Sequence, residues 1–552
     1  MNLMEIARNG LGSAQSALNV VGNNINNAYS GSSDDPFIGG YSRQSIMLGE
    51  AGGRTTNYGF FGYGVQVDGV QRAYDSFINN QVRNSATEYH SLNSRYEQLS
   101  QIDNMLGDDT SNVSSSLNNV FGALEKMSSD PVSQAARQEV LSNFKTIANQ
   151  FQSNSKTLTG LEKSTNTQIS QSVDDINSYS SQLAKINAEI SKVNAQTGGM
   201  PADLLDKRDT LLTQISEMTG VKVDENKANG TVNVTLANGM PLVSGDKSYQ
   251  LSASTSAEDP NKTIVSYIDA AGNETQLNEE KMSGGKLGGL FKFRNEDLVD
   301  ARNQLNELAL KMANQFNEVN KAGYDLNGDQ GGDIFSIANP AAIANRNNSG
   351  DAKLNVTFSD ISQVNATDYT VTFKGPDWEI TRADGSTVTP TVGDDGALQF
   401  DGISIMPEGT PKAGDSFVVN PVAGAADNIS VALTEGNQIA ASSSSDPDDE
   451  SNNENIKEMI AIKTAKVIGD ATLNDAYASL TSSVGSSTSA LSGSVQTCAS
   501  TADQFIQQQQ SVAGVDLNEE YVNLQMFTQY YQANAQVLQT ATSLFDTILS
   551  IR

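Results

Sequence analysis

The side chains that most often carry catalysis are scarce in this chain. Its 552 residues include one histidine, His90, and one cysteine, Cys498. A Ser-His-Asp or Cys-His triad needs a histidine as general base, and histidine zinc sites need several such ligands. Both kinds of site are therefore nearly excluded, and Cys498 has no internal disulfide partner. His90 lies in a helix-like run, and we expect it on a helix surface.

Carboxylates are the remaining candidates for acid–base chemistry. The run LLDKRD places Asp206, Arg208 and Asp209 within four residues on one predicted helix. Without a partner histidine, such charges are typical of a solvated or ion-paired helix face. A glycosidase-type acid pair needs no histidine, so a secreted, carboxylate-dependent hydrolase built on residues 352–432 stays as a remote alternative. Because the acids there, such as Asp394, stand in turn-like contexts, we predict no catalytic site and no enzyme activity.

Two short motifs resemble ligand-binding loops but lack essential positions. The run DLNGDQGGD starts like a calcium loop, yet it has Gln330 where the turn needs glycine and Ser336 where a bidentate glutamate is expected. We interpret it as an Asx/Gly turn after a helix. The run GFFGYG (59–64) lacks the strand–turn–helix context of a phosphate loop, and we expect it to form a structural turn. Trp378 is expected to anchor a core or loop. No metal or cofactor site is predicted.

The overall charge restricts the partners. The formal net charge is 35 − 65 = −30, which disfavours nucleic acid and anionic membranes. The first residues, MNLMEIARNGLGSAQSALN, lack the basic segment and continuous apolar core of a secretory signal peptide. No window of 18 apolar residues exists, so no membrane span is predicted. We expect a protein that is cytoplasmic or is exported by a route without a cleaved signal.

Apolar stripes mark both ends of the chain. The N-terminal stripe has alternating spacings of three and four, as in a coiled-coil helix, and consists of Met4, Ala7, Leu11, Ala14, Leu18, Val21 and Ile25. The C-terminal stripe keeps the same spacing in Leu524, Phe527, Tyr531, Asn534, Leu538, Ala541, Phe545 and Ile548. We expect the two helices to pair as a coiled coil, with the polar Asn534 fixing their register.

The energetics of a single terminal helix are unfavourable. Burying the five large residues of the N-terminal stripe would contribute roughly 8–15 kcal/mol. Fixing the backbone of about 25 residues costs about 25–50 kcal/mol, which helix hydrogen bonds offset only in part. Each terminal helix is therefore expected to need the other one, and neighbouring molecules as well.

Between the ends, helix-like and strand-like stretches alternate. Helices are expected at residues 74–106, from Asp130-Pro131 to Gly198-Gly199, at 201–220, at 296–320, and from 456 to the C-terminus with a break at 511–518. Strands are expected around an Asn229-Gly230 hairpin, at 263–268 and through 352–432, and residues 441–455 have the composition of a solvated acidic loop. The order is helical, β, helical, β, helical, and its simplest folding is nested.

The predicted fold class is a multidomain α + β protein. It has terminal helices paired as a coiled coil, a domain of bundled long helices, and two inserted, mainly-β domains. The expected domains are residues 1–70 with 505–552 (axial), 71–200 with 456–504 (helical bundle), 201–350 with 421–455 (mixed β and helix), and 351–420 (small inserted β domain).

Sequence signatures at both ends and in the middle carry a family resemblance. The runs LNVVGNNINN and GGYSRQ resemble the N-terminal signature of bacterial flagellar axial proteins, and VDLNEEYVNLQMFTQYYQANAQVLQTATSLFDTIL resembles their C-terminal signature. The runs ADLLDKRDTLLTQIS and GGKLGGLFKFRNEDLVDARNQLNELALKMANQFNEVNKAGYD are similar to the flagellar hook-associated protein 1 (FlgK) family. The resemblance covers residues 1–350 and 425–552.

The resemblance implies a structural, non-enzymatic part of the bacterial flagellum. Such a protein forms a ring at the hook–filament junction, is needed for filament assembly and motility, and is exported unfolded through the flagellar type III channel to the cell exterior. The implied partners are further copies of a chain that is monomeric in solution, the hook protein, a second junction protein of the FlgL type, and an export chaperone on the C-terminal helix. A hook protein or flagellin is the alternative within this class, although the central helices disfavour the first and the N-terminal signature disfavours the second.

The signatures and stripes together define a predicted assembly interface. Its residues are Leu11, Leu18, Val21, Asn23, Asn24, Ile25, Asn27, Tyr41, Arg43, Glu519, Glu520, Leu524, Phe527, Tyr531, Asn534, Leu538, Phe545 and Ile548. The asparagines flank the last stripe residue, Ile25, and are expected to bond to neighbouring subunits without the desolvation cost of charges. A helix C-cap and turn is the alternative for Asn26 and Asn27.

The sequence departs from the family pattern in one place. Between Asn27 and Gly40 it carries AYSGSSDDPFIG, which is longer than the usual link in the family. The position of Tyr41 and Arg43 relative to the first helix therefore stays open at this point.

Overall fold

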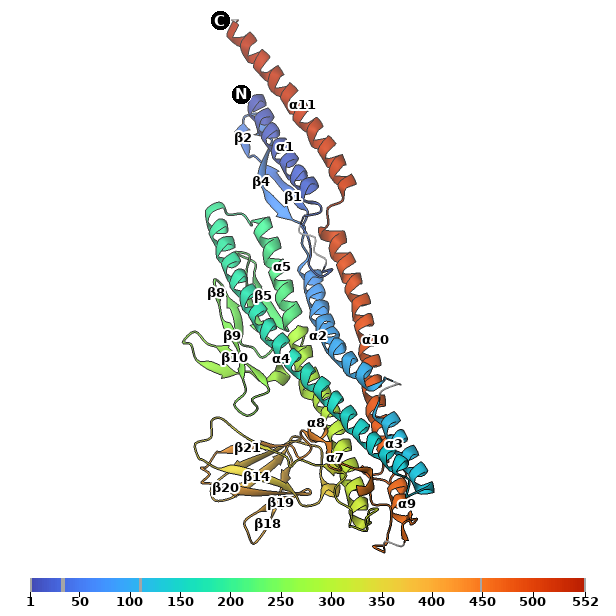
Figure 1. The fold of residues 1–552 in the computed structure, drawn as a ribbon. Helices are drawn as coiled ribbons and strands as arrows, with labels where there is room; N and C mark the ends of the chain where they lie inside the picture. The colour runs from blue at the N-terminus through green and yellow to red at the C-terminus, as the bar shows by residue number, and fades with distance from the viewer. Residues whose placement is uncertain (1, 31–34, 109–111, 447–448, 551–552) are drawn as a thin grey trace.

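The computed structural model describes residues 2–30, 35–108, 112–446 and 449–550. The molecule is elongated, with both termini at one end and a β domain toward the other (Figure 1). Between them lies a body of long helices that carries two small sheets. The predicted multidomain α + β class with paired terminal helices is confirmed.

The terminal helices α1 (Asn2–Asn27) and α11 (Leu517–Ser550) pack side by side and run antiparallel (Figure 1). The last turns of α11 extend past the start of α1. Two hairpins follow α1: β1 (Gln44–Glu50) pairs with β4 (Val65–Arg72), and β2 (Gly53–Thr56) pairs with β3 (Gly59–Gly62). The first hairpin packs against α1.

The motif GFFGYG is not a turn, as the sequence suggested, but contains strand β3. Its two phenylalanines favour an extended, pleated conformation, while the turn itself precedes them. Gly59, the first residue of the strand, and Gly64, just beyond its end, adopt positive φ angles of 124° and 88°.

The buried face of α1 carries mostly small side chains, namely Ala7, Gly10, Ser13, Ala14, Ala17, Val20, Val21 and Asn24. The predicted stripe is correct at Ala7, Ala14 and Val21. Its large members Leu11, Leu18 and Ile25 are only half-buried. Because α11 and the β1–β4 hairpin both contact α1, the buried face is wider than one seam, and the large side chains lie at its margin.

The body is built from helices of very different length. They are α2 (Ser76–Leu106), α3 (Val113–Ser129), α4 (Gln134–Thr197), α5 (Ala202–Met218), α6 (Gly285–Lys292), α7 (Leu298–Ala322), α8 (Ala425–Asn428), α9 (Glu454–Ala461) and α10 (Leu473–Ala513). A π-helical turn, Phe293–Asp297, joins α6 to α7. Within the described ranges, no helix is long and apolar enough to cross a membrane.

The long helix α4 begins later than the sequence predicts. Asp130 follows the end of α3, a helix that the sequence analysis missed, and Pro131 is not in the first turn of α4. The N-cap is Ser133, whose hydroxyl accepts a hydrogen bond from the backbone N–H of Ala136. Serine accepts a hydrogen bond from an unpaired backbone N–H of the first turn, as aspartate would. The sequence alone therefore could not distinguish Ser133 from Asp130 as the N-cap. The predicted end is correct, since Gly198 caps α4 with a φ of 67°.

Two apolar cores lie along α4. The first half of α4 packs with α3, α7, α9 and α10 around the rings of Phe121, Phe144, Phe316 and Phe335. The second half packs with α5, α6 and two antiparallel sheets. Their strands are β5 (Val221–Asn226), β6 (Thr231–Leu236), β7 (Pro241–Ser244) and β8 (Lys247–Ser248) in one, and β9 (Gln250–Thr255), β10 (Thr263–Ile268) and β11 (Glu274–Gln276) in the other.

The β domain contains two antiparallel sheets around a common core. One has the order β13 (Ala342–Ala344), β21 (Ser416–Val419), β15 (Tyr369–Phe373), β16 (Trp378–Arg382) and β17 (Thr387–Val388). The other has the order β14 (Lys353–Phe358), β20 (Ile403–Glu408), β19 (Leu398–Phe400) and β18 (Thr391–Val392). A separate pair, β12 (Phe335–Ser336) with β22 (Ser430–Val431), belongs to the helical body.

Two local predictions in this half of the chain are confirmed. Trp378 packs between Phe373 and Phe417, with ring centroids 5.0 Å and 6.0 Å away. The carboxylate of Asp325 accepts hydrogen bonds from the backbone N–H groups of Asn327 and Asp329. The run DLNGDQGGD is therefore an Asx turn.

Candidate assembly site

Asn24 joins the two terminal helices to the chain that follows α1. Its side chain is 1% exposed. The amide donates to the carbonyl of Gln44 at 2.8 Å and to Glu520 at 3.1 Å, and its oxygen accepts from the Tyr41 hydroxyl and the Gln44 N–H, both at 3.0 Å. All four hydrogen-bonding positions of the amide are thus used. Burial, and then the carboxylates of α5, raise the pKa of Tyr41 to about 12, so its hydroxyl remains a donor.

Arg43 connects this point to the start of α11. Its Nε donates to Glu520 at 2.8 Å, and its terminal nitrogens form a bidentate pair with Glu519 at 2.8 and 3.1 Å. Its backbone N–H donates to the carbonyl of Ala513, the last residue of α10. Bidentate guanidinium–carboxylate bonds fix orientation as well as distance. Arg43 therefore holds α10, α11 and β1 in one arrangement.

The polar network continues from the terminal helices into α5. Ser42 donates to Asp206 from its backbone N–H at 3.1 Å and from its hydroxyl at 2.7 Å. Arg72, the last residue of β4, pairs with Asp206 at 2.7 Å and with Asp209 at 2.6 Å. The axial end is therefore attached to the body mainly through charged and polar contacts, and the apolar core that the two share is small.

Arg208 anchors the other side of these carboxylates. It is fully buried and pairs with Asp209 and Glu225, each at 2.8 Å, and donates to the carbonyl of Gly230 at 2.6 Å. Burial by itself would raise the pKa of Asp209, but Arg208 and Arg72 outweigh it and hold the pKa below its ordinary value. The LLDKRD run is ion-paired, as expected. It lies at the contact between the axial end and the body rather than on an open, solvated helix face.

The terminal helices pack closely at Gly10. A Cβ atom built there would lie 2.3 Å from the Oδ1 of Asn534, whose amide donates to the carbonyl of Tyr530 within α11. The spacing 24 − 10 = 14 on α1 equals the spacing 534 − 520 = 14 on α11. The Asn24–Glu520 and Gly10–Asn534 contacts therefore belong to one antiparallel register.

The outer faces of the axial end expose large apolar side chains. On α11 these are Tyr521, Val522, Tyr530, Tyr531, Val537, Leu544, Phe545, Ile548 and Leu549. On the hairpins they are Met47, Leu48, Tyr58, Phe60, Phe61, Val65, Val67 and Val70. Exposed apolar side chains that gather in one region of a protein often mark an interaction site. We call these two sets the axial apolar surface.

The predicted interface residues separate into three groups. The first group forms the polar network around the buried Asn24 and Glu520, with Glu519 at its exposed edge: Asn24, Tyr41, Arg43, Glu519 and Glu520. The second lines the contact between the terminal helices, buried or half-buried: Leu11, Leu18, Val21, Ile25, Leu524, Phe527, Asn534 and Leu538. The third is exposed: Asn23, Tyr531, Phe545 and Ile548. Asn27 donates to the carbonyl of Asn23 and closes the helix end.

The sequence analysis missed the hairpins of residues 44–72. They contribute half of the axial apolar surface, although no strand was expected there. The alternation in SIMLGE and VQVDGV, with glycines between the two runs, is the signal that could have revealed them.

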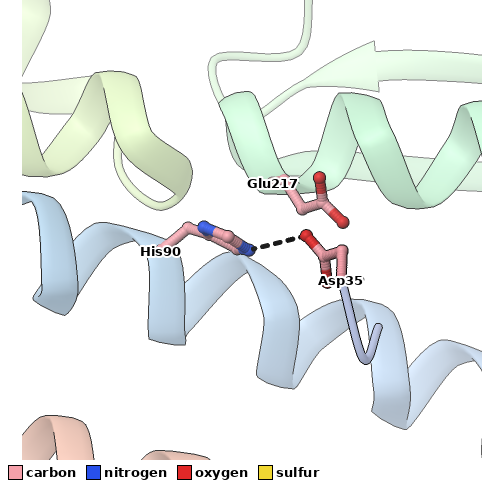
Figure 2. A group of neighbouring side chains, drawn as sticks. All are labelled: Asp35, His90 and Glu217. Carbon is pink, nitrogen blue, oxygen red and sulfur yellow. Dashed lines mark ion pairs between the residues drawn. The ribbon is translucent and has the colours of Figure 1, made fainter. Parts of the chain in front are cut away.

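A second polar cluster lies where the link after α1 meets the body (Figure 2). Asp35 comes from the link, His90 from α2 and Glu217 from the last turn of α5. His90 is on a helix, as expected, but it is half-buried beside Phe37 and Tyr89 rather than on the open surface, because the link folds over it. Burial, and then Asp35, raise the pKa of Glu217 to about 8, while burial lowers the pKa of His90.

Comparison with known proteins identifies the family. Models of the flagellar hook-associated protein FlgK helical domain, the hook-associated protein 1 D2-like domain and the flagellar basal body rod FlgEFG protein C-terminal region match residues 99–335, 343–421 and 506–551. Flagellar hook-associated protein 1 of Escherichia coli (strain K12) is 41% identical over 555 residues, and that of Salmonella typhimurium is 42% identical over 560 residues, each covering 100% of both chains. The chain belongs to the flagellar hook-associated protein 1 (FlgK) family.

A solved structure agrees with this membership. The flagellar hook junction protein FlgK from Burkholderia pseudomallei superposes with a TM-score of 0.71 at 27% identity, covering 78% of this chain and 100% of that chain. The predicted family is confirmed, and so is the predicted class of function. The chain is a structural, hook-associated protein of the bacterial flagellum.

Proposed function

We propose that the chain is a non-enzymatic building block of the hook–filament junction, with the axial apolar surface as the contact between neighbouring subunits. The observation that carries this proposal is the concentration of exposed apolar side chains at the end where both termini lie (Figure 1). The similar protein from Burkholderia pseudomallei is itself named a hook junction protein.

The last turns of α11 contribute most to this argument. Leu544, Phe545, Ile548 and Leu549 lie beyond the reach of α1 and are 46–68% exposed. Covering a large apolar side chain completely contributes about 1.5–3 kcal/mol. A neighbouring subunit that packs against these turns would therefore gain several such contributions, since no other element of the described chain covers them.

We infer two roles for the predicted interface residues. The buried network around Asn24 and Arg43 acts within one subunit, where it fixes the angle between the terminal helices and the body. The exposed apolar residues, together with Asn23, act between subunits. In this view the domain division stays as proposed, with residues 1–70 and 505–552 axial, although α7 shares its core with the helical bundle.

The proposed partners follow the same geometry. Copies of the chain would form a ring through the axial end, with the hook protein on one side and a second junction protein of the FlgL type on the other. Before assembly the chain would be a monomer whose α11 is covered by an export chaperone. Export without a cleaved signal would then deliver it to the cell exterior, and the lone Cys498 places no disulfide in the way of an unfolded passage.

The alternatives receive less support. Asp394, the carboxylate that tests the hydrolase alternative, is exposed in the turn between β18 and β19. A hook protein or flagellin would not account for the match of the FlgK helical-domain model to residues 99–335.

Removal of α11 tests the proposal. We expect deletion of residues 521–552 to leave a soluble, helical protein that no longer binds isolated hooks stripped of filament. A finer variant replaces Leu544, Phe545 and Ile548 by serine and should weaken hook binding at least tenfold, with an unchanged helical circular dichroism spectrum. The matched control is Val392→Ser, which removes an exposed apolar side chain from the β domain and should leave binding unchanged. Normal filament growth with the truncated chain would overturn the proposal.

A further inference from the structure

We propose that Asp35, His90 and Glu217 form a binding site for one divalent transition-metal ion of the Zn²⁺ type. The ion would fasten the link after α1 to α2 and α5. The three residues come from three separate segments, and each offers one ligand atom within 4.8 Å of the other two (Figure 2). This site is independent of the axial apolar surface.

The spacing fits one ion after a small adjustment. Tetrahedral zinc with bonds of about 2.0–2.1 Å holds neighbouring ligand atoms roughly 3.3 Å apart. The His90 Nε2 is 3.9 Å from the Asp35 carboxylate, so closure needs a movement of well under 1 Å along this pair. Asp35 lies in a surface link, where such a movement is easily accommodated.

A separate observation points to a ligand at this site. Glu217 is only 5% exposed, and its Oε1 has no hydrogen-bond partner among the described residues. The Nε2 of His90 is likewise buried and without a hydrogen bond there. Leaving a buried polar atom unsatisfied is unfavourable by about 1–3 kcal/mol. The His90 imidazole and the Glu217 carboxyl group both lie beside the Asp35 carboxylate (Figure 2).

The donor set selects the class of ion. One imidazole nitrogen and two carboxylates suit Zn²⁺ and its neighbours in the first transition row, whereas Ca²⁺ and Mg²⁺ prefer sites made of oxygen alone. The Asp35 carboxylate balances the positive charge of Lys286, and a bound ion would displace the proton from the Glu217 carboxyl group. The side chains of His90 and Asp35 are 24% and 26% exposed, so an ion and a fourth, water ligand can reach the site.

The position of the site gives it a structural role. The link already packs on the body through Phe37, which lies in a small core with Val82, Ala86, Ala502 and Ile506. A bound ion would add a directional tie between the link and α5. Because the link leads directly to Tyr41 and Arg43, the ion would help to hold the axial end on the body. The ligand Asp35 belongs to the part of the link that is longer than usual in the family.

The test is a titration of the full-length chain with Zn²⁺ after removal of bound metal by a chelator. We expect one equivalent of Zn²⁺ to bind. The dissociation constant should be about 1 μM or below, as expected for a site with three protein ligands. His90→Ala should weaken binding at least 100-fold and Glu217→Gln at least tenfold. With Co²⁺ in place of Zn²⁺, the visible absorption bands of a low-symmetry, nitrogen- and oxygen-ligated ion should appear in the parent chain and disappear in His90→Ala.

Two control variants separate this site from other metal binding. Glu97→Gln removes an exposed carboxylate from the same helix, and Cys498→Ser removes the only thiol. Both should bind Zn²⁺ as the parent does. The proposal is overturned if the parent shows no binding at 10 μM Zn²⁺, if His90→Ala binds normally, or if Cys498→Ser loses binding. Thermal melts in chelator, compared between parent and variants, establish that each variant is folded.

Discussion

The axial end and the helical body of this protein pack in opposite ways. In the body, the rings of Phe144, Phe316 and Phe335 are fully buried where helices from distant parts of the chain meet. At the axial end, α1 uses alanine and glycine to bring its partners close, and the large apolar residues lie outside. The body therefore completes its core within one chain, whereas the axial end leaves large apolar side chains exposed.

Under the proposed function, this difference would let one chain fold before assembly and still bind its neighbours through the axial end. The two parts share few apolar contacts, and a polar network from Asn24 through Arg43 and Arg72 to Arg208 joins them. Polar contacts of this kind fix geometry more than they add stability. Changes in the body should consequently affect global unfolding, and changes in the axial end should affect local opening and assembly.

The largest expected effect is in the body core. Phe316→Ala removes a ring that contacts Phe121, Phe144 and Phe335, and it should lower the free energy of unfolding by about 3–5 kcal/mol. The matched axial variant, Phe527→Ala, removes a half-buried ring and should cost about 1 kcal/mol or less. Urea denaturation followed by circular dichroism measures both. Equal losses would contradict the contrast between the two parts.

The next effect is at the contact between them. Asp209→Asn leaves the buried Arg208 with Glu225 as its remaining carboxylate and should destabilise by about 2–4 kcal/mol. Since the folded state holds the pKa of Asp209 below 3.8, the unfolded state binds more protons as the pH falls. The stabilisation is therefore present above about pH 3.8 and is lost as the pH falls through the folded pKa. Acid unfolding curves of Asp209→Asn should lack this contribution, and a curve parallel to that of the parent would speak against it.

A smaller and more local effect is expected at Arg43. Arg43→Met leaves the buried Glu520 without its cation. It should therefore lower the free energy of locally opening the contact between α11 and α10 by about 1–3 kcal/mol. Amide hydrogen exchange should speed up in α11 and at residues 41–44 but not in α4 or α7. Glu519→Gln is the matched control, because its side chain is 55% exposed, and it should change exchange very little. Faster exchange throughout the body would show that the network supports more than the axial end.

Much of the fold was predictable because long elements carry strong periodicity. Apolar periodicity predicted α2, α4, α7 and α11, and Asn229-Gly230 predicted the hairpin between β5 and β6. The helix expected from residue 456 onward is interrupted between α9 and α10. Helix starts were harder: Asp130 and Ser133 are both good caps, and tertiary packing of α3 decided between them. The stripe of α1 was only partly correct because the sequence does not reveal that two elements cover it.

The site was predictable as a set of residues but not as a network. Family signatures indicated Asn24, Tyr41, Arg43 and Glu520, yet their mutual bonds depend on the path of the link and on strand pairing between residues far apart. The cluster of Asp35, His90 and Glu217 was invisible for the same reason, because its members are separated by 55 and 127 residues (90 − 35 and 217 − 90). Single-sequence periodicity carries no information on such contacts.

The finest test of the contrast is a pair of glycines on α1. Gly10→Leu would force a side chain into Asn534 and should weaken the pairing of α1 with α11 by about 1–2 kcal/mol, since overpacking strains a close contact. Gly12→Leu adds the same side chain where nothing lies within 4 Å and should stabilise α1 by a few tenths of a kcal/mol to about 1 kcal/mol through helix propensity. Amide exchange of α1 distinguishes the two. Adding Asn534→Ala to Gly10→Leu should restore part of the loss if this contact sets the register. Neither substitution touches the apolar core of the body. The free energy of global unfolding of both variants should therefore equal that of the parent, and only the axial end should change.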